Sequence, residues 1–477
     1  MIDFTALLEY NGKSMTKKTR NILFLACLIL FFLIAPGAVF YSQGYRIDFN
    51  PPEGGVKVAQ TGALYSKIQP KSVQIYLNGK LTKKTDFLFG SAFLENLLPK
   101  EYNIEIKKQG FSSWKKTLEI KEKEVTEVKN IVLIPESPNF EILAKEVENF
   151  FFLPDGKKII LKENSEEGWA LKILELKKNV KSHLIGEKEI SIKGADLLGL
   201  KPFPDSRRIL LEIGLKEDVK YYILEIDKTP AVITSLYFLS DIENLSFHPK
   251  DQEKLFALQN GELREVNLAK KEITSPLLRD IITFIISNDN IYYLDKSGFI
   301  LKTDFSFSHK EKINETPFPL AVELPHQIDF FSPYFFLREE ETLYFIKEDQ
   351  KSFTKLSSLV KNFSVSPDGK KIVYFNNLEI WLFFLKDELG QPQKKAGDQL
   401  FLTRFSEEIK DCFWYTAHYL MFDTGEKIKI AEIDDRDKLN IVNLANFKKP
   451  KLFWNWSDKK LYLQTEKNLL SSKKLLP

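Results

Sequence analysis

The stretches FLPDGKKIILK, from Phe152 to Lys162, and VSPDGKKIVYF, from Val365 to Phe375, decide the fold of this 477-residue chain. Each contains an apolar run, a Pro-Asp-Gly turn, two lysines and a second apolar run. Proline and glycine preset the backbone angles of a tight turn, and an alternating run of β-branched residues suits a strand. Two such copies, far apart in one chain, predict a repeated β-hairpin unit.

Weaker copies of this unit occupy much of residues 136–477. They are PFPDSRRILLEI (Pro202–Ile213), SFHPKDQEKLFAL (Ser246–Leu258), ISNDNIYYLD (Ile286–Asp295), FSPYFFLREEETLYFI (Phe331–Ile346), FWYTAHYLMFD (Phe413–Asp423) and WNWSDKKLYLQ (Trp454–Gln464). Equivalent points at Pro154, Pro204, Pro249, Asn288, Pro333, Pro367, Tyr415 and Ser457 lie 34 to 50 residues apart. That period, with several short strands in each copy, is typical of a β-propeller blade.

The clearest copies share their turn residues. The expected repeat turns are at Pro154, Asp155 and Gly156, at Pro204 and Asp205, and at Pro367, Asp368 and Gly369. The pattern (S/F)PDGKK followed by an apolar strand resembles the repeat of TolB-like, WD-like propellers. We predict about eight blades, with seven as the alternative, and expect Asn139–Ala144 to complete the last blade by pairing with strands after Trp456.

Near the N-terminus, residues 22–40 carry no charged side chain. The expected membrane anchor contains Ile22, Leu23, Phe24, Leu25, Leu28, Ile29, Leu30, Phe31, Phe32, Leu33 and Ile34. Its length matches a hydrocarbon core of about 30 Å and exceeds the apolar region of a cleaved signal peptide, so we expect an uncleaved signal anchor, with cleavage as the alternative. Lys13, Lys17, Lys18 and Arg20 precede it and only Arg46 follows closely, which predicts a cytoplasmic N-terminus and an extracytoplasmic main body.

Residues 56–135 change to short alternating runs separated by turn residues, the pattern of a small β-sandwich. Asn78-Gly79 is the strongest hairpin signal, because both residues accept positive φ. The segment resembles the PEGA domain, a small extracytoplasmic β-sandwich of bacterial and archaeal envelope proteins. The resemblance depends on Pro70, on VQIYLNGK (Val73–Lys80), on LPKEY (Leu98–Tyr102) and on Gly110-Phe111 with Trp114. Pro70-Lys71-Ser72-Val73 stands in place of the Pro-Glu-Gly-Ala that names the family.

The sequence contains no motif of known catalytic or cofactor chemistry. There is no Gly-x-Ser-x-Gly, HExxH, Gly-x-Gly-x-x-Gly, phosphate-binding loop or CxxC, and the five histidines do not fall at metal-ligand spacing. The lack of a basic stripe, of a zinc-binding pattern and of an expected cytoplasmic domain argues against nucleic-acid binding. We therefore expect no catalytic residues, no cofactor and no metal.

The predicted order is a cytoplasmic stub (1–20), a transmembrane signal anchor (21–41), a linker (42–55), a PEGA-like β-sandwich (56–135) and a β-propeller (136–477), an all-β fold apart from the anchor. This arrangement, in a bacterial cell envelope, predicts a membrane-anchored scaffold whose propeller binds envelope proteins or cell-wall polymer. The alternative is an enzyme that acts on glycans or other envelope substrates in the propeller channel. Carboxylates that converge there would favour it.

Overall fold

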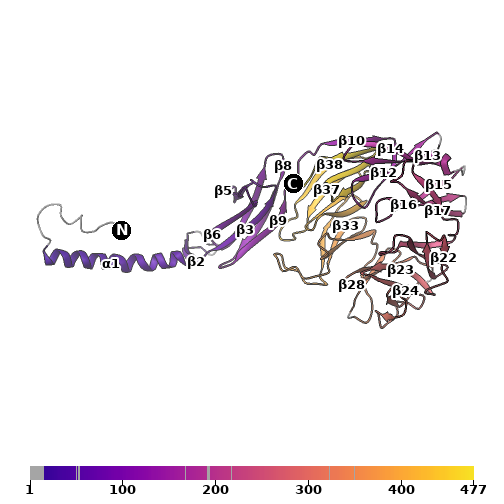
Figure 1. Ribbon diagram of the computed structural model, residues 1–477. Helices are drawn as coiled ribbons and strands as arrows, with labels where there is room; N and C mark the ends of the chain where they lie inside the picture. Colours follow the sequence, from indigo (N-terminus) through magenta and orange to yellow (C-terminus); the bar gives the residue numbers. More distant parts are fainter. Residues whose placement is uncertain are drawn as a thin grey trace. The chain divides into compact units, whose positions relative to one another are not determined.

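The computed structural model describes residues 16–49, 51, 54–166, 168–190, 194–215, 218–321, 323–348 and 350–476. The chain divides into two compact units, one of residues up to Lys107 with Ser113–Val132, the other of Lys108–Ser112 with Leu133 onward. Each is described by itself. Apart from one α-helix and the 3-10 helix η1 (Glu187–Ile190), the regular structure of the described residues is β-strand (Figure 1).

The first unit begins with helix α1 (Lys17–Ser42). Thr16 caps it, because its hydroxyl oxygen accepts the amide proton of Thr19 (3.3 Å). The helix ends at Ser42, and Gly44, whose φ is 86°, lets the chain turn into strand β1 (Tyr45–Asp48). Strand β1 pairs antiparallel with β2 (Lys57–Gln60).

Two sheets follow in this unit, as expected for a β-sandwich. One has the order β6-β3-β9 and the other β5-β4-β7-β8. Their strands are β3 (Gly62–Gln69), β4 (Gln74–Leu77), β5 (Lys80–Lys84), β6 (Ser91–Leu97), β7 (Lys100–Lys108), β8 (Phe111–Ile120) and β9 (Val125–Val132). Their buried apolar residues alternate along the strands, for example Ile104 and Ile106 in β7, so that one face of the sheet is covered.

The second unit is a β-propeller built from four-stranded antiparallel sheets. Seven of these sheets each contain four strands that are consecutive in the chain. The first two sheets contain β11 (Val147–Phe152), β12 (Lys158–Ser165), β13 (Gly168–Glu175) and β14 (Val180–Gly186), then β15 (Asp196–Pro202), β16 (Arg208–Leu215), β17 (Asp218–Glu225) and β18 (Val232–Ser235). The next three contain β19 (Ile242–Phe247), β20 (Lys254–Gln259), β21 (Glu262–Asn267) and β22 (Glu272–Ile273), then β23 (Ile281–Ser287), β24 (Asn290–Asp295), β25 (Ile300–Thr303) and β26 (Lys310–Lys312), then β27 (His326–Phe331), β28 (Tyr334–Glu339), β29 (Thr342–Lys347) and β30 (Thr354–Ser357). The last two of the seven contain β31 (Asn362–Val365), β32 (Lys371–Phe375), β33 (Glu379–Phe384) and β34 (Gln399–Arg404), then β35 (Asp411–Thr416), β36 (Tyr419–Asp423), β37 (Lys427–Glu432) and β38 (Ile441–Asn446).

The last sheet joins the two ends of this unit. Strand β10 (Phe140–Lys145) pairs antiparallel with β41 (Asn468–Ser472), which continues into β40 (Lys460–Thr465) and β39 (Lys451–Asn455). Figure 1 shows the violet β10 beside the yellow C-terminal strands. This pairing confirms that Asn139–Ala144 completes the sheet that follows Trp456, so the first and the last strand of this unit close the ring in one sheet.

The core consists of apolar clusters between neighbouring sheets. Leu171 of one sheet and Leu211 of the next belong to one cluster, and Phe383 packs with Phe336 of the preceding sheet in another. Since both faces of a blade are covered, its middle strands are mostly buried and rich in apolar residues. Ile159, Ile160 and Leu161 are all buried in β12, as are all five residues of β36.

Candidate binding surfaces

The aspartates of the repeat turns organise the hairpins between the first and second strands of their sheets. The Asp155 carboxylate accepts the amide proton of Lys157 (2.8 Å), and Asp205 accepts that of Arg207 (2.8 Å). Asp368 and Asp458 make the same bond two residues onward (3.2 and 3.1 Å). Pro154, Pro204 and Pro367 each precede such an aspartate. In each turn the aspartate side chain therefore accepts an amide proton that a backbone carbonyl would otherwise accept.

The residue after each aspartate lies in the left-handed region of backbone space. Gly156 and Gly369 have φ of 64° and 65°, and Ser206 and Lys459, which occupy the same place in their turns, have φ of 56° and 59°. The Pro-Asp-Gly sequence therefore identifies only two of these four equivalent turns.

Three of the weaker copies have a different and shorter turn. Ser287 pairs directly with Asn290, Phe331 with Tyr334, and Thr416 with Tyr419, so two residues make each loop. The prediction that Asn288, Pro333 and Tyr415 occupy positions equivalent to Pro154 is therefore wrong in turn geometry. A two-residue loop has no room for the Pro-Asp-Gly-Lys sequence, and for this reason these copies match only in spacing.

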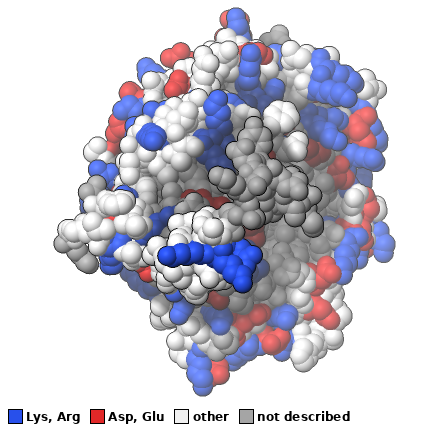
Figure 2. Space-filling view, turned by 90° about the vertical axis from the view of Figure 1, so that its left-hand side faces the viewer, with Lys and Arg blue, Asp and Glu red and all other residues white. Residues whose placement is uncertain are grey.

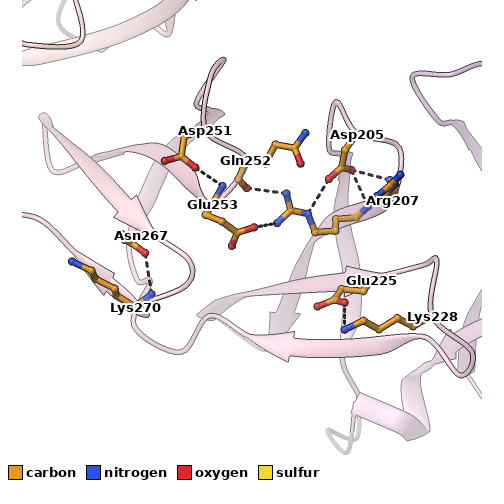
Figure 3. A network of polar contacts seen from close by, with 10 residues as sticks. Asp205, Arg207, Glu225, Lys228, Asp251, Gln252, Glu253, Asn267 and Lys270 are labelled. Atoms are coloured by element: carbon orange, nitrogen blue, oxygen red, sulfur yellow. Dashed lines mark hydrogen bonds and ion pairs between the residues drawn. The ribbon is translucent and has the colours of Figure 1, made fainter.

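Side chains connect the turns of successive sheets to one another. Arg208 donates to Asp205 (3.0 Å) in its own turn, to the Glu253 carboxylate (2.9 Å) and to the Gln252 carbonyl (2.9 Å) in the next turn (Figure 3). Further bridges are Ser457 Oγ to Gly156 O (3.2 Å), Asp155 N to Ser206 Oγ (3.1 Å), and Lys250 Nζ to Asp289 Oδ2 (2.9 Å). The turns of five consecutive sheets are thus linked.

A groove of about 450 Å³ lies at the opposite end of sheet β15–β18 from its repeat turn. Its walls are the first half of β17 and the connection from β18 to β19, and they include Tyr221, Tyr222, Tyr237, Asp218 and Lys220. Tyr237 is 76% exposed, whereas the other two tyrosines are buried. Tyrosines with a solvent-exposed edge and charged neighbours are typical of surfaces that bind proteins or small polar ligands.

A half-buried carboxylate, Asp411, and a buried one, Asp423, lie side by side in the sheet β35–β38. Asp411 in β35 is the direct partner of Asp423 in β36. Burial raises the pKa of Asp423 to about 6, and the Asp411 charge adds to this effect, while Lys410 and Lys361 oppose it. Burial also raises the pKa of Asp411. Within the described residues, no group of three or more His, Cys, Asp or Glu side chains is placed to hold a metal ion.

The aromatic residues considered from sequence lie mainly in the core. Trp414 is buried and donates its indole proton to the Ser364 carbonyl (3.0 Å). Trp454 is buried against Tyr415, with ring centroids 4.8 Å apart, and Trp456 is partly exposed beside Lys459. Of these three tryptophans, only Trp456 is available to a ligand.

The predicted anchor residues lie along α1. Ile22, Leu23, Phe24, Leu25, Leu28, Ile29, Leu30, Phe31, Phe32, Leu33 and Ile34 are all exposed, and no residue of the helix is buried. Within the described part of the chain, α1 is the one helix long and apolar enough to cross a membrane. Lys13 lies outside the described residues.

The predicted sandwich hairpin joins β4 to β5. Asn78 and Gly79 have φ of 49° and 79°, the angles of a type I′ turn, and Leu77 pairs with Lys80. The Asn78 side chain also accepts the amide proton of Asn103 (2.9 Å), which ties the turn to β7.

Lys and Arg side chains mingle with Asp and Glu over the visible surface in Figure 2, with no extended area of acidic charge. On the face in view, the intermixed charges do not form the continuous basic stripe that is typical of a nucleic-acid site.

No family model matches this sequence, and no curated protein sequence matches it. Solved structures with a similar fold include the Cps50 (Swd1) β-propeller domain of Myceliophteria thermophila (11% identity, TM-score 0.41), which covers 70% of this chain and 99% of that domain. The WD40 domain of SCAP from fission yeast (10% identity, TM-score 0.42) covers 71% and 98%. An oligogalacturonate lyase in complex with manganese (12% identity, TM-score 0.40) covers 71% and 93%. These similarities concern the fold alone.

Proposed function

We propose that this protein is a single-pass membrane-anchored scaffold whose PEGA-like sandwich and TolB-like propeller face the outside of a bacterial cell. The observation that carries the proposal is that α1 exposes all its large apolar side chains while the chain continues into a propeller. Each Leu, Ile, Phe or Val at the centre of such a helix favours insertion by about 0.3–0.6 kcal/mol. Lipid is the environment that covers this helix.

The orientation follows from the basic residues on either side of α1. Lys13, Lys17, Lys18 and Arg20 precede the apolar run, and Arg46 alone follows closely. An excess of lysine and arginine on one side places that side in the cytoplasm. An engineered cysteine at Thr82, which is exposed in β5, should then react with an impermeant reagent added to intact cells, whereas one at Ser14 should not. Labelling of Ser14 alone would reverse the topology.

For the ligand, we propose an envelope protein or a wall polymer, bound at the groove between β17 and the β18–β19 connection. Tyr237 supplies an exposed aromatic surface at its rim, and Asp218 and Lys220 supply charges of both signs. Exposed tyrosines are frequent at binding hot spots, since they bury a large area and retain a hydroxyl for hydrogen bonding.

The test compares the full-length protein in nanodiscs with two variants. Tyr237→Ala should weaken capture of a cross-linkable envelope partner, or of sedimented peptidoglycan, by about tenfold or more, since truncation of an important interface residue costs more than about 1 kcal/mol and about 1.4 kcal/mol corresponds to tenfold. Leu389→Ala is the matched control, because Leu389 is also highly exposed but lies outside the groove. Equal binding by all three proteins would exclude the groove.

The alternative of an enzyme gains one specific observation, the neighbouring Asp411 and Asp423 with raised pKa values. A carboxyl that titrates near neutral pH can exchange protons with a substrate. We expect no turnover of wall glycans by the full-length protein. Hydrolysis that is abolished by Asp411→Asn, with binding retained, would replace the scaffold by an enzyme.

A further inference from the structure

The hairpin of β1 and β2 has an apolar face that no described residue covers. Ile47 and Val58 are direct partners across the two strands and are 53% and 62% exposed. Phe49 and Val56, next to these strands, are 69% and 67% exposed. The following residue of each strand, Asp48 or Ala59, is buried. The outward face of a hairpin in water is normally polar, so this alternation is inverted.

Hydrogen bonds hold this hairpin at the C-terminal end of α1. The Gly44 carbonyl accepts protons from the Thr61 amide (2.9 Å) and from the Thr61 hydroxyl (2.9 Å). The Gln60 side chain donates to the Gln43 carbonyl (3.1 Å). The open end of the hairpin, where β1 begins and β2 ends, is therefore fixed to the two residues that follow the helix.

Aromatic rings and one arginine surround the junction. Phe40 and Tyr45 pack edge to face, with ring centroids 5.4 Å apart. The Arg46 guanidinium lies 3.6 Å from the centre of the Tyr41 ring and donates to the carbonyl oxygens of Tyr41 and Tyr45 (both 2.8 Å). Tyrosine and arginine are the residues that occupy the headgroup level of a bilayer, where the ring or stem is apolar and the tip is wet.

We propose that the apolar face formed by Ile47, Phe49, Val56 and Val58 lies in the headgroup and acyl boundary of the leaflet that α1 leaves. Twenty-six helical residues extend about 39 Å, against a hydrocarbon core of about 30 Å, so the end of the helix reaches the boundary region. Apolar faces of amphipathic segments are buried in this region to a depth of about 5–10 Å. The hairpin thus fixes how the first unit meets the membrane. This inference rests on the proposed anchoring of α1.

The chain supplies a matched control at the other end of β3. Phe87 is 79% exposed and belongs to the same unit, but it lies in the loop before Gly90, whose carbonyl accepts the amide proton of Ile68 at the far end of β3. The eight residues of β3 separate it from Thr61 by about 25 Å. If exposure and apolarity alone caused lipid binding, both Phe87 and the β1–β2 hairpin would contact lipid. Under the proposal, only the hairpin contacts lipid.

The experiment uses the full chain in anionic vesicles, with a Cys27→Ser background and single cysteines at Val58, Ile47 or Phe87 carrying an environment-sensitive fluorophore. The remaining Cys412 is buried. We expect lipids with a shallow doxyl group to quench the probes at Val58 and Ile47 about twofold more than the probe at Phe87. Flotation at alkaline pH measures the insertion of α1 independently.

Three results decide the proposal. Flotation with selective quenching at Val58 and Ile47 supports it. Flotation with the same quenching at all three positions overturns it. Flotation with blue-shifted but unquenched probes at the hairpin also overturns it, since this result would mean that a protein surface covers the apolar face. Failure to float would overturn the anchoring of α1, and this inference with it.

Discussion

Replacing the turn glycines Gly156 and Gly369 with alanine should separate backbone strain from contacts between sheets. The two residues have nearly the same φ, 64° and 65°, in turns of the same sequence. Alanine in the left-handed region costs roughly 1–2 kcal/mol, because its Cβ approaches the following carbonyl oxygen. This strain should be common to both variants.

The surroundings of the two glycines differ. A Cβ at Gly156 would lie 2.7 Å from Ser457 Oγ and 2.8 Å from Asn455 Oδ1, whereas a Cβ at Gly369 meets nothing within 4 Å. Ser457 and Asn455 both donate to the Gly156 carbonyl (3.2 and 2.8 Å). Displacing these two bonds should cost about 1–3 kcal/mol more, since each contributes about 0.5–1.5 kcal/mol. We therefore expect a loss of about 2–5 kcal/mol for Gly156→Ala and about 1–2 kcal/mol for Gly369→Ala.

The measurement is urea unfolding of the full chain, with hydrogen exchange of β12 and β32 to assign the transition to the propeller. Lys459→Gly is the control, because Lys459 has a φ of 59° at the equivalent position, where glycine relieves strain and no loss is expected. Equal losses at Gly156 and Gly369, or a loss for Lys459→Gly as large as that for Gly156→Ala, would refute the reasoning.

Three further predictions concern contacts within the propeller. Arg208→Lys should lower the free energy of unfolding by about 1–3 kcal/mol, since lysine cannot donate to Asp205 and the next turn together, and protection of the next turn against hydrogen exchange should fall with it. Asp423→Asn should stabilise the fold at pH 7.5 but not at pH 4. The raised pKa, about 6, means that the protonated carboxyl stabilises the native state at low pH and that this contribution is lost as pH rises through about 6, so urea midpoints of the two proteins should converge below pH 4. Tyr415→Phe should cost about 1–3 kcal/mol because it leaves the buried Leu475 carbonyl without its 3.0 Å hydrogen bond, and thermal unfolding would contradict this if it did not change.

The sequence predicted the parts of the fold that depend on local signals. The Pro-Asp-Gly turns, the uncharged run of α1 and the Asn78-Gly79 hairpin each depend on the conformational preferences of a few adjacent residues. The pairing of β10 with β41 was also accessible, because a closed ring needs its first apolar strand beside its last. These features need no knowledge of distant contacts.

Contacts between repeats were not accessible in this way. Nothing near Arg208 in the sequence indicates that it meets Glu253, and nothing in Ser206 or Lys459 indicates a positive φ. These residues adopt the left-handed conformation because the surrounding hairpin imposes it, and serine and lysine have no strong preference for it. The groove at Tyr237 was not predictable from sequence for the same reason, since its walls come from a strand and from the connection to the next sheet.

The two ends of the sheets have different physical roles, and this difference favours binding at the groove. At the end with the repeat turns, bridges such as Arg208 to Glu253 tie successive sheets together, so a ligand there would compete with bonds that hold the ring. At the opposite end, the connection before β19 is not constrained by the repeat and carries the exposed Tyr237. Loops on a rigid scaffold vary freely without loss of the fold and are the usual place of recognition. A ligand at this end leaves the bridges between the turns intact.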